Sequence, residues 1–183
     1  MFADEHKMPL VLVMALGFRG RCLVQSGRIQ DGLELIVRGN ELARAIGTVS
    51  YLPFWLADAA DVYGIAGQAA TGFSKLGEAE RLIQMTGERW YDAEVHRLRG
   101  KLLRVTGDST NAEVSFRRAV MIGQEQSAKL FELRAATSLA HLWRDQDKWT
   151  EARDLLAPIY GWFTEGFDTP VLQDAKALLD ELA

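Results

Sequence analysis

Five basic side chains in the second half of the sequence have a spacing that could bind an anion; they are Arg97, Lys101, Arg104, Arg134 and Arg144. The first three follow one another at i, i+4 and i+7, and the other two stand at the ends of a second stripe of helical period, so each set shares one helix face. Like charges so placed repel. Either the cluster binds an acidic group through charge-assisted hydrogen bonds, or its members pair with Glu94, Asp145 and neighbouring carboxylates on a solvated face.

The other reactive side chains form no recognisable catalytic or metal-binding set. The sequence has no GxxxxGK[ST] phosphate loop and no HExxH, and His6, His96 and His141 lack metal-ligand spacing. Cys22 has no histidine nearby in sequence to act as its base, so we expect a buried, inert thiol. We therefore predict no enzyme activity, no catalytic residue, no cofactor and no metal.

Composition limits the class of protein. The chain has 183 residues, 48% hydrophobic and 25% charged, which suits one globular domain spanning 1–183. A single cysteine cannot form an internal disulfide, and no apolar stretch reaches the ~20 residues of a membrane helix. The net charge of -4 disfavours nucleic acid as a partner. We expect a cytoplasmic protein without membrane contact.

The elements that must position the basic side chains are set by an internal repeat. The sequence aligns with itself at a period of 40 residues, four times over. A small anchor residue recurs at Gly32, Gly72, Ala112 and Ala152. A turn residue stands five positions earlier, at Gly27, Gly67, Gly107 and Asp147. A large apolar residue follows the anchor by four, at Ile36, Leu76, Phe116 and Leu156. Before the turn, small residues recur at Gly20, Ala60, Gly100 and Ala140, and large ones at Leu23, Tyr63, Leu103 and Trp143.

Because these registers have helical spacing, each repeat is predicted to be two antiparallel helices joined by a short turn. The hairpins are expected at 9–46, 50–86, 89–127 and 129–162. Their first helices are predicted near 9–26, 50–66, 89–106 and 129–146, and their second helices near 29–46, 69–86, 109–127 and 149–162. Asp108 or Ser109 is a candidate N-cap, and Gly47 and Gly87 are candidate left-handed caps.

The two ends of the sequence differ. Thr169-Pro170 begins a helix over 170–182 that has one apolar side and one polar side, as expected for a helix that caps the last repeat. Residues 1–8 are interpreted as the remnant of a preceding repeat. The apolar side chains expected to lack cover there are Phe2, Met8, Leu10, Val11 and Val13. This end is predicted to self-associate or dock on an upstream domain, unless residues 1–8 fold back as a cap.

The repeat resembles the tetratricopeptide repeat (TPR). The third repeat carries the consensus types at Gly100, Leu103, Gly107, Ala112, Phe116 and Ala119. The sequence departs from that family in its period, 40 rather than the usual 34 or so, and in Gly32, Gly72 and Asp147 at positions that are normally Ala, Ala and Gly. The resemblance implies an all-α, right-handed solenoid of about four helical hairpins with a C-terminal capping helix.

A narrower resemblance rests on the stretches 60–68, 87–103 and 132–182. These are similar to the C-terminal repeat region of bacterial multidomain signalling ATPases that are often classed with adenylate or guanylate cyclases, a region related to the repeat arrays of LuxR-type and maltotriose-responsive transcriptional activators. The resemblance implies a regulatory or interaction module without catalytic residues. Its partner would be a peptide, a protein or a neighbouring domain; the alternative is a sensor for a small metabolite.

In TPR arrays the first helices line the concave surface, and this likeness places candidate binding residues on the four repeats. They are Phe54, Asp61, Arg97, Lys101, Arg104, Arg134, His141 and Arg144. The first two repeats contribute a mostly small and apolar wall with Arg21 and Asp61, and the last two contribute the basic cluster. An acidic peptide or a C-terminal carboxylate is the ligand such a groove would favour.

Overall fold

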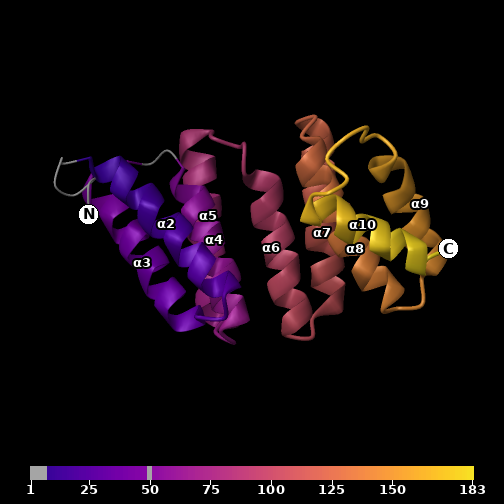
Figure 1. Ribbon diagram of the computed structural model, residues 1–183, viewed down its shortest axis with the longest axis horizontal. Coiled ribbons are helices and arrows are strands. Elements are labelled where there is room, and N and C mark those ends of the chain that lie inside the picture. The colour runs from indigo at the N-terminus through magenta and orange to yellow at the C-terminus, as the bar shows by residue number, and fades with distance from the viewer. Residues whose placement is uncertain (1–7, 49–50) are drawn as a thin grey trace. The chain divides into compact units, whose positions relative to one another are not determined.

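The computed structural model describes residues 8–48 and 51–183, and every regular element in this part of the protein is an α-helix (Figure 1). The predicted all-α fold is confirmed. The helices are α2 (Pro9–Gln25), α3 (Ile29–Ala45), α4 (Leu52–Ile65), α5 (Ala69–Thr86), α6 (Asp92–Val105), α7 (Ser109–Glu125), α8 (Lys129–Arg144), α9 (Trp149–Tyr160) and α10 (Pro170–Glu181).

The chain divides into two compact units, Met1–Tyr91 and Asp92–Ala183. The first unit holds the hairpins α2–α3 and α4–α5, and the second holds α6–α7 and α8–α9 followed by α10. A single domain over 1–183 stays a prediction. Residues 1–7, and with them most of the expected repeat remnant, lie outside the described residues. No helix in the part that the structure describes is long and apolar enough to cross a membrane.

In the first unit, small residues let the paired helices approach closely. A Cβ added at Gly20 of α2 would lie 2.7 Å from the Gly32 carbonyl oxygen of α3, so a larger residue would force the two backbones apart. Around this contact, buried side chains from α2, α3 and α4 form the core, namely Val24, Leu33, Ile36, Ala59 and Val62.

In the second unit, one core joins all the hairpins and the last helix. Phe116 of α7 packs on Gly100 of α6, where an added Cβ would lie 2.6 Å from its ring. The apolar side of α10 is buried through Leu172, Ala175 and Leu178 against α8 and α9. The predicted capping helix is confirmed over nearly its predicted length.

The turn residues have the conformation that their register predicts. Gly27, Gly67 and Gly107 have positive φ values, and Asp147 takes the same left-handed conformation with a φ of 60°. The second helices end on a matching register, where Gly47, Gly87 and Ser127 are also left-handed. A left-handed residue lets the backbone reverse directly after a helix.

Three local expectations need correction. Helix α6 begins at Asp92 instead of near 89, so Trp90 and Tyr91 lie in the turn before it. Val13, expected to lack cover, is buried in the core, whereas Met8, Leu10 and Val11 are exposed as expected. Cys22, expected to be buried, is exposed, because no described helix packs on the outer side of α2.

Candidate binding sites

Basic side chains line a groove in the second unit, here called the basic groove. It consists of two adjoining depressions of about 390 Å³ and 230 Å³, both bordered by Arg97 and Ser138. The basic residues on its walls are Arg97, Lys101, Arg104, Arg134 and His141, so the structure brings five of the eight predicted site residues together. Asp174 of α10 is the one carboxylate among the described residues that line it.

A buried carboxylate holds two of these cations. Glu94 of α6 is 1% exposed, and its Oε1 accepts hydrogen bonds from Arg97 Nε at 2.9 Å and Nη2 at 2.6 Å. Arg134 Nη2 of α8 lies 2.7 Å from the same oxygen. Arg97 Nη1 also reaches the Ser138 hydroxyl at 3.5 Å. One carboxylate thus fixes two guanidiniums at the wall of the groove.

At the other end of the first depression the cations pair with exposed carboxylates. Asp145 accepts from Arg104 at 3.1 Å and from Arg144 at 2.9 Å, and Arg144 also bonds Glu181 of α10 at 2.7 Å. The hydrogen bonds that Arg144 donates to Asp145 and, with a smaller effect, to Glu181 raise the pKa of Arg144. Arg144 does not border either depression, so its place in the predicted site is at the margin. The cluster therefore pairs with Glu94 and Asp145, as one alternative expected, and binding of an acidic group by the groove that it lines stays a prediction.

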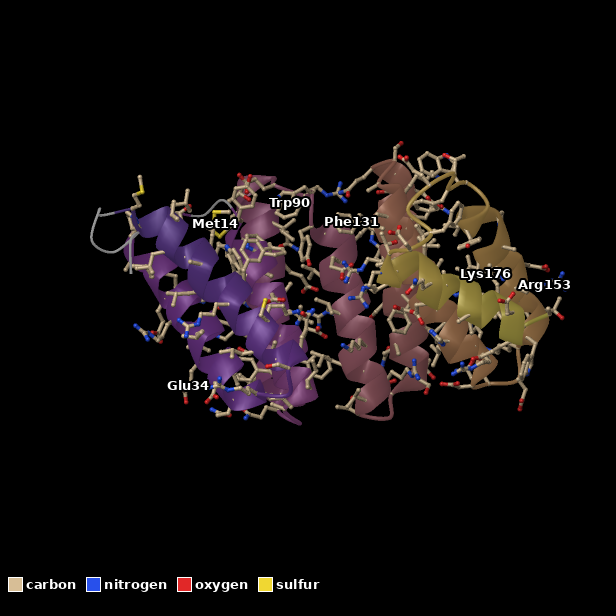
Figure 2. All side chains as sticks on the ribbon, viewed as in Figure 1. Met14, Glu34, Trp90, Phe131, Arg153 and Lys176 are labelled. Atoms are coloured by element: carbon tan, nitrogen blue, oxygen red, sulfur yellow. The ribbon has the colours of Figure 1, made fainter. Side chains whose placement is uncertain are left out.

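A second groove, in the first unit, is almost wholly apolar and is here called the apolar groove. It has a volume of about 410 Å³. Its lining comes from α2, from α4 with the residue before it, and from the turn before α6, namely Leu10, Met14, Phe18, Tyr51, Phe54, Trp55 and Trp90. The rings of Phe54 and Trp55 lie 4.6 Å apart, and those of Tyr51 and Trp90 lie 5.6 Å apart, as centroid distances. Met14 and Trp90 are labelled in Figure 2.

One cation and two carboxylates join α2 to α4 one turn beyond the apolar groove. Arg21 Nη2 donates to Asp61 at 2.8 Å, and Arg21 Nη1 lies 3.3 Å from Asp58. Burial raises the pKa of Asp58 to about 6, an effect that the Arg21 charge only partly offsets because its short bond goes to Asp61. Asp61, a predicted groove residue, is buried in this cluster and holds the two helices together.

Sequence reasoning found Phe54 and an apolar wall but missed the apolar groove as a site. Tyr51 and Trp90 complete it from outside the helices, where helical registers say nothing of side-chain direction. The available signal was the density of aromatic residues in 51–55 and 90–91. Among the described residues, no group of three histidines, cysteines or carboxylates is arranged to hold a metal ion.

Comparison with solved structures shows the fold. Two crystal structures of a putative kinesin light chain from Podosopora anserina, with nearly identical TPR-like repeats, superpose with a TM-score of 0.69 at 16% sequence identity. They cover 95% of this chain, and the match takes in 85% and 86% of theirs. The protein therefore has a TPR-like helical repeat fold.

One relative is similar in sequence over most of this chain. An uncharacterized protein of Rhizobium meliloti (strain 1021) is 30% identical over 142 residues, which are 77% of this chain. The match spans only 14% of that much longer protein. No family model matches the sequence.

Proposed function

We propose that the protein is a non-catalytic protein-interaction module whose basic groove binds an acidic segment of a partner. The observation that carries the proposal is the pair of guanidiniums of Arg97 and Arg134, which buried Glu94 holds at the wall of the groove. Because these side chains are already oriented, a ligand carboxylate would meet them with little loss of side-chain entropy. Charge-assisted bonds from guanidinium to carboxylate are about twice as strong as neutral ones.

The balance of charge along the groove supports an acidic ligand. Among the described residues, Arg97, Lys101, Arg104 and Arg134 line the groove together with one carboxylate, Asp174, and Glu94 and Asp145 pair with three of these cations; the protein as a whole has a net charge of -4. A local positive field on an acidic protein favours an acidic peptide or a free C-terminal carboxylate over nucleic acid.

A longer parent protein is the context that we propose for this module. The resemblance to the repeat region of signalling ATPases and cyclases supports it, as does the small share of the Rhizobium meliloti protein that the sequence matches. In such a protein, in the cytoplasm, the exposed Met8, Leu10 and Val11 offer a surface for docking on a neighbouring domain or for self-association.

Binding of a fluorescein-labelled peptide rich in Asp and Glu, with a free C-terminal carboxylate, tests the proposal by fluorescence anisotropy. The variant Arg104→Glu reverses a charge that is 42% exposed at the groove, and we expect binding to weaken by about tenfold or more. The matched control is Arg153→Glu, the same change at an exposed position on α9 of the same unit (Figure 2). Binding of the wild type should also weaken as salt is raised.

Two results would contradict the acidic ligand. Equal affinities for the two variants would show that overall charge, not the groove, attracts the peptide. No binding of the labelled peptide at low salt would reject the groove as an acidic-peptide site. Comparison with an amidated peptide separates recognition of the terminal carboxylate from recognition of acidic side chains.

A further inference from the structure

The apolar groove of the first unit has open, aromatic walls. Five of its side chains, those of Leu10, Met14, Phe18, Tyr51 and Trp90, are between 43% and 57% exposed. At about 150–250 Å² for a large side chain, this amounts to roughly 500 Å² of exposed surface on one side of a small unit. Contiguous apolar patches of this size on soluble proteins usually mark a binding surface.

The floor of the groove is specified by the sequence. Trp55 lies over Gly17 of α2, where an added Cβ would sit 2.1 Å from the indole ring. The Phe18 ring meets the same indole edge-on at 5.3 Å. Only a glycine at this position admits the tryptophan, so the indole that forms the floor is held in place by the helix beside it.

We propose that this groove binds an amphipathic helix from a partner protein, with apolar residues at i, i+4 and i+7 and a basic residue beyond the last of them. The inference goes beyond the acidic ligand proposed for the basic groove, because it concerns another unit and another chemistry.

The spacing of the lining residues favours a helix. Leu10, Met14 and Phe18 recur every four residues along α2 and extend over about 12 Å, which is the span of two helical turns. An amphipathic helix lying along them presents its own apolar residues at the same interval.

The chemistry of the lining disfavours a small metabolite. Its polar side-chain atoms are the Tyr51 hydroxyl and the two indole N–H groups, and none of the seven lining residues is charged. Small-molecule sites enclose most of the ligand's surface, whereas five of the seven residues here are about half exposed, which suits a helix laid along an open apolar wall. The area also disfavours a second copy of the protein, since a stable interface of standard size takes about 800 Å² from each partner.

The charged residues near the end of the apolar groove indicate which residue the bound helix should carry beside its apolar positions. One turn after Phe18 and Phe54 lie Arg21 and Asp58, and Asp61 lies one turn further along α4; together the three carry a net negative charge when both carboxylates are ionised. A lysine or arginine beyond the last apolar anchor would meet this cluster favourably, and an acidic residue there would be repelled.

Titration of the protein with a labelled synthetic helix tests the inference by anisotropy. The probe has about 16 residues, enough to be helical, with leucines at i, i+4 and i+7 and lysines at both ends. We expect it to bind, and we expect Met14→Glu to weaken binding by at least about tenfold, because the new carboxylate lies in the apolar wall. The matched control is Met85→Glu on α5 of the same unit, at a methionine that is 81% exposed and outside the groove.

A second variant and two more probes sharpen the result. Leu10→Glu, in the first turn of α2 where an acidic residue suits the helix dipole, should weaken binding without loss of helix content. A probe of identical composition with its leucines spread around the helix should not bind. A probe with glutamates in place of the end lysines should bind a few-fold more weakly.

Four outcomes would overturn the inference. Equal binding of the two leucine arrangements, or equal effects of Met14→Glu and Met85→Glu, would remove the groove from the interaction. Binding of anilinonaphthalene sulfonate, a dye with an aromatic body and one anionic group, that Met14→Glu abolishes, without binding of the helix, would make this a small-molecule site. A concentration-dependent dimer that Met14→Glu dissolves would make a second copy the occupant. The variant Arg104→Glu should leave the helix probe unaffected, so failure of the basic groove and failure of this site can be told apart.

Discussion

Met14 and Phe54 in the first unit stand at the same repeat position as Glu94 and Arg134 in the second. The position that follows by three residues holds Gly17 and Ala57 in one unit and Arg97 and Thr137 in the other. The backbone is alike in both, because turn residues and small residues at the helix contacts set it. The two positions named above differ in residue type between the units, so one scaffold carries an apolar surface and a charged one.

The ionic clusters of the two units have opposite compositions. In the first unit one cation, Arg21, pairs with two carboxylates, Asp58 and Asp61. In the second unit one carboxylate, Glu94, pairs with two guanidiniums, those of Arg97 and Arg134. Each cluster joins the first helices of successive hairpins, α2 to α4 or α6 to α8. In each unit, ion pairs therefore link the two hairpins.

Removal of the shared carboxylate in the second unit should have the largest effect. Glu94→Met, which installs the residue that the first repeat has, removes the buried carboxylate that bonds Arg97 and Arg134. We expect the free energy of unfolding to fall by about 3–4 kcal/mol, within the lower part of the range for a broken buried pair because Arg134 is one third exposed. Urea denaturation measures it, with Glu125→Met on the surface of α7 as control, for which the change should stay within about 0.5 kcal/mol. Similar values for the two variants would show that Glu94 does not link the hairpins.

The surplus carboxylate of the first unit should make stability depend on pH. The folded-state pKa of Asp58, about 6, lies above its ordinary value near 4, so its favourable contribution is present at low pH and is lost as the pH rises through 6. From about pH 4 to pH 7 the loss is up to about 3 kcal/mol. In Asp58→Asn this part of the pH dependence should disappear, so that the variant gains on the wild type as the pH rises. Parallel curves of unfolding free energy against pH for the two proteins would contradict the raised pKa.

The close helix contacts of the two units should respond differently to a methyl group. Gly20→Ala sets a Cβ against the Gly32 carbonyl oxygen, whereas Gly100→Ala sets one against the Phe116 ring, which can tilt. We expect Gly20→Ala to lower the unfolding free energy by about 2 kcal/mol and Gly100→Ala by about 1 kcal/mol, after the helix-propensity gain of alanine. Chemical denaturation of both variants checks the order. A larger loss for Gly100→Ala would mean that the Phe116 ring is more tightly held than the α2–α3 contact.

The fold was accessible from the sequence because it depends on a few residue types at a fixed period. Gly107 and Asp147 look unlike, yet both stand at the turn register and both are left-handed. The basic groove was accessible too, since Arg97, Lys101 and Arg104 lie on one stripe of a single helix. Helical spacing in the sequence therefore predicts both the hairpins and the side chains that share one face of a helix.

The apolar groove and the ionic clusters were harder to foresee, because they depend on contacts between segments of different geometry. Trp90 contributes from a turn that the periodicity assigned to a helix. The link from Arg21 to Asp61 joins residues 40 apart, which is one period, but nothing in the sequence distinguishes this pair from unrelated charges at the same separation. Cys22 was misplaced because its repeat equivalent in the second hairpin, Val62, packs against the preceding hairpin, whereas α2 has no preceding hairpin within the described residues.

Exchanging the N-cap residues of α5 and α7 should have the smallest effect on stability. The exchange tests one difference between the units, the side chain that caps an equivalent helix. Gln68 and Asp108 are the N-cap residues of α5 and α7, one period apart, and their backbone angles are similar. Asp108 Oδ1 accepts from the Asn111 amide nitrogen at 3.1 Å, and Oδ2 accepts from the Asn111 side chain at 2.7 Å, whereas Gln68 makes no such cap.

Asp108→Gln should therefore lower the melting temperature by a few degrees, and Gln68→Asp should raise it. The gain should be the smaller of the two, because Thr71, which stands where α7 has Asn111, has no side-chain amide to add a second bond. The hydrogen bonds from the side chain and then the backbone of Asn111 lower the pKa of Asp108, so its contribution is present at neutral pH and is lost as the pH falls through that lowered value. Thermal melts followed by circular dichroism at neutral and acidic pH measure all three effects. A melting temperature that Gln68→Asp leaves unchanged would show that the first turn of α5 differs from that of α7 in more than its cap.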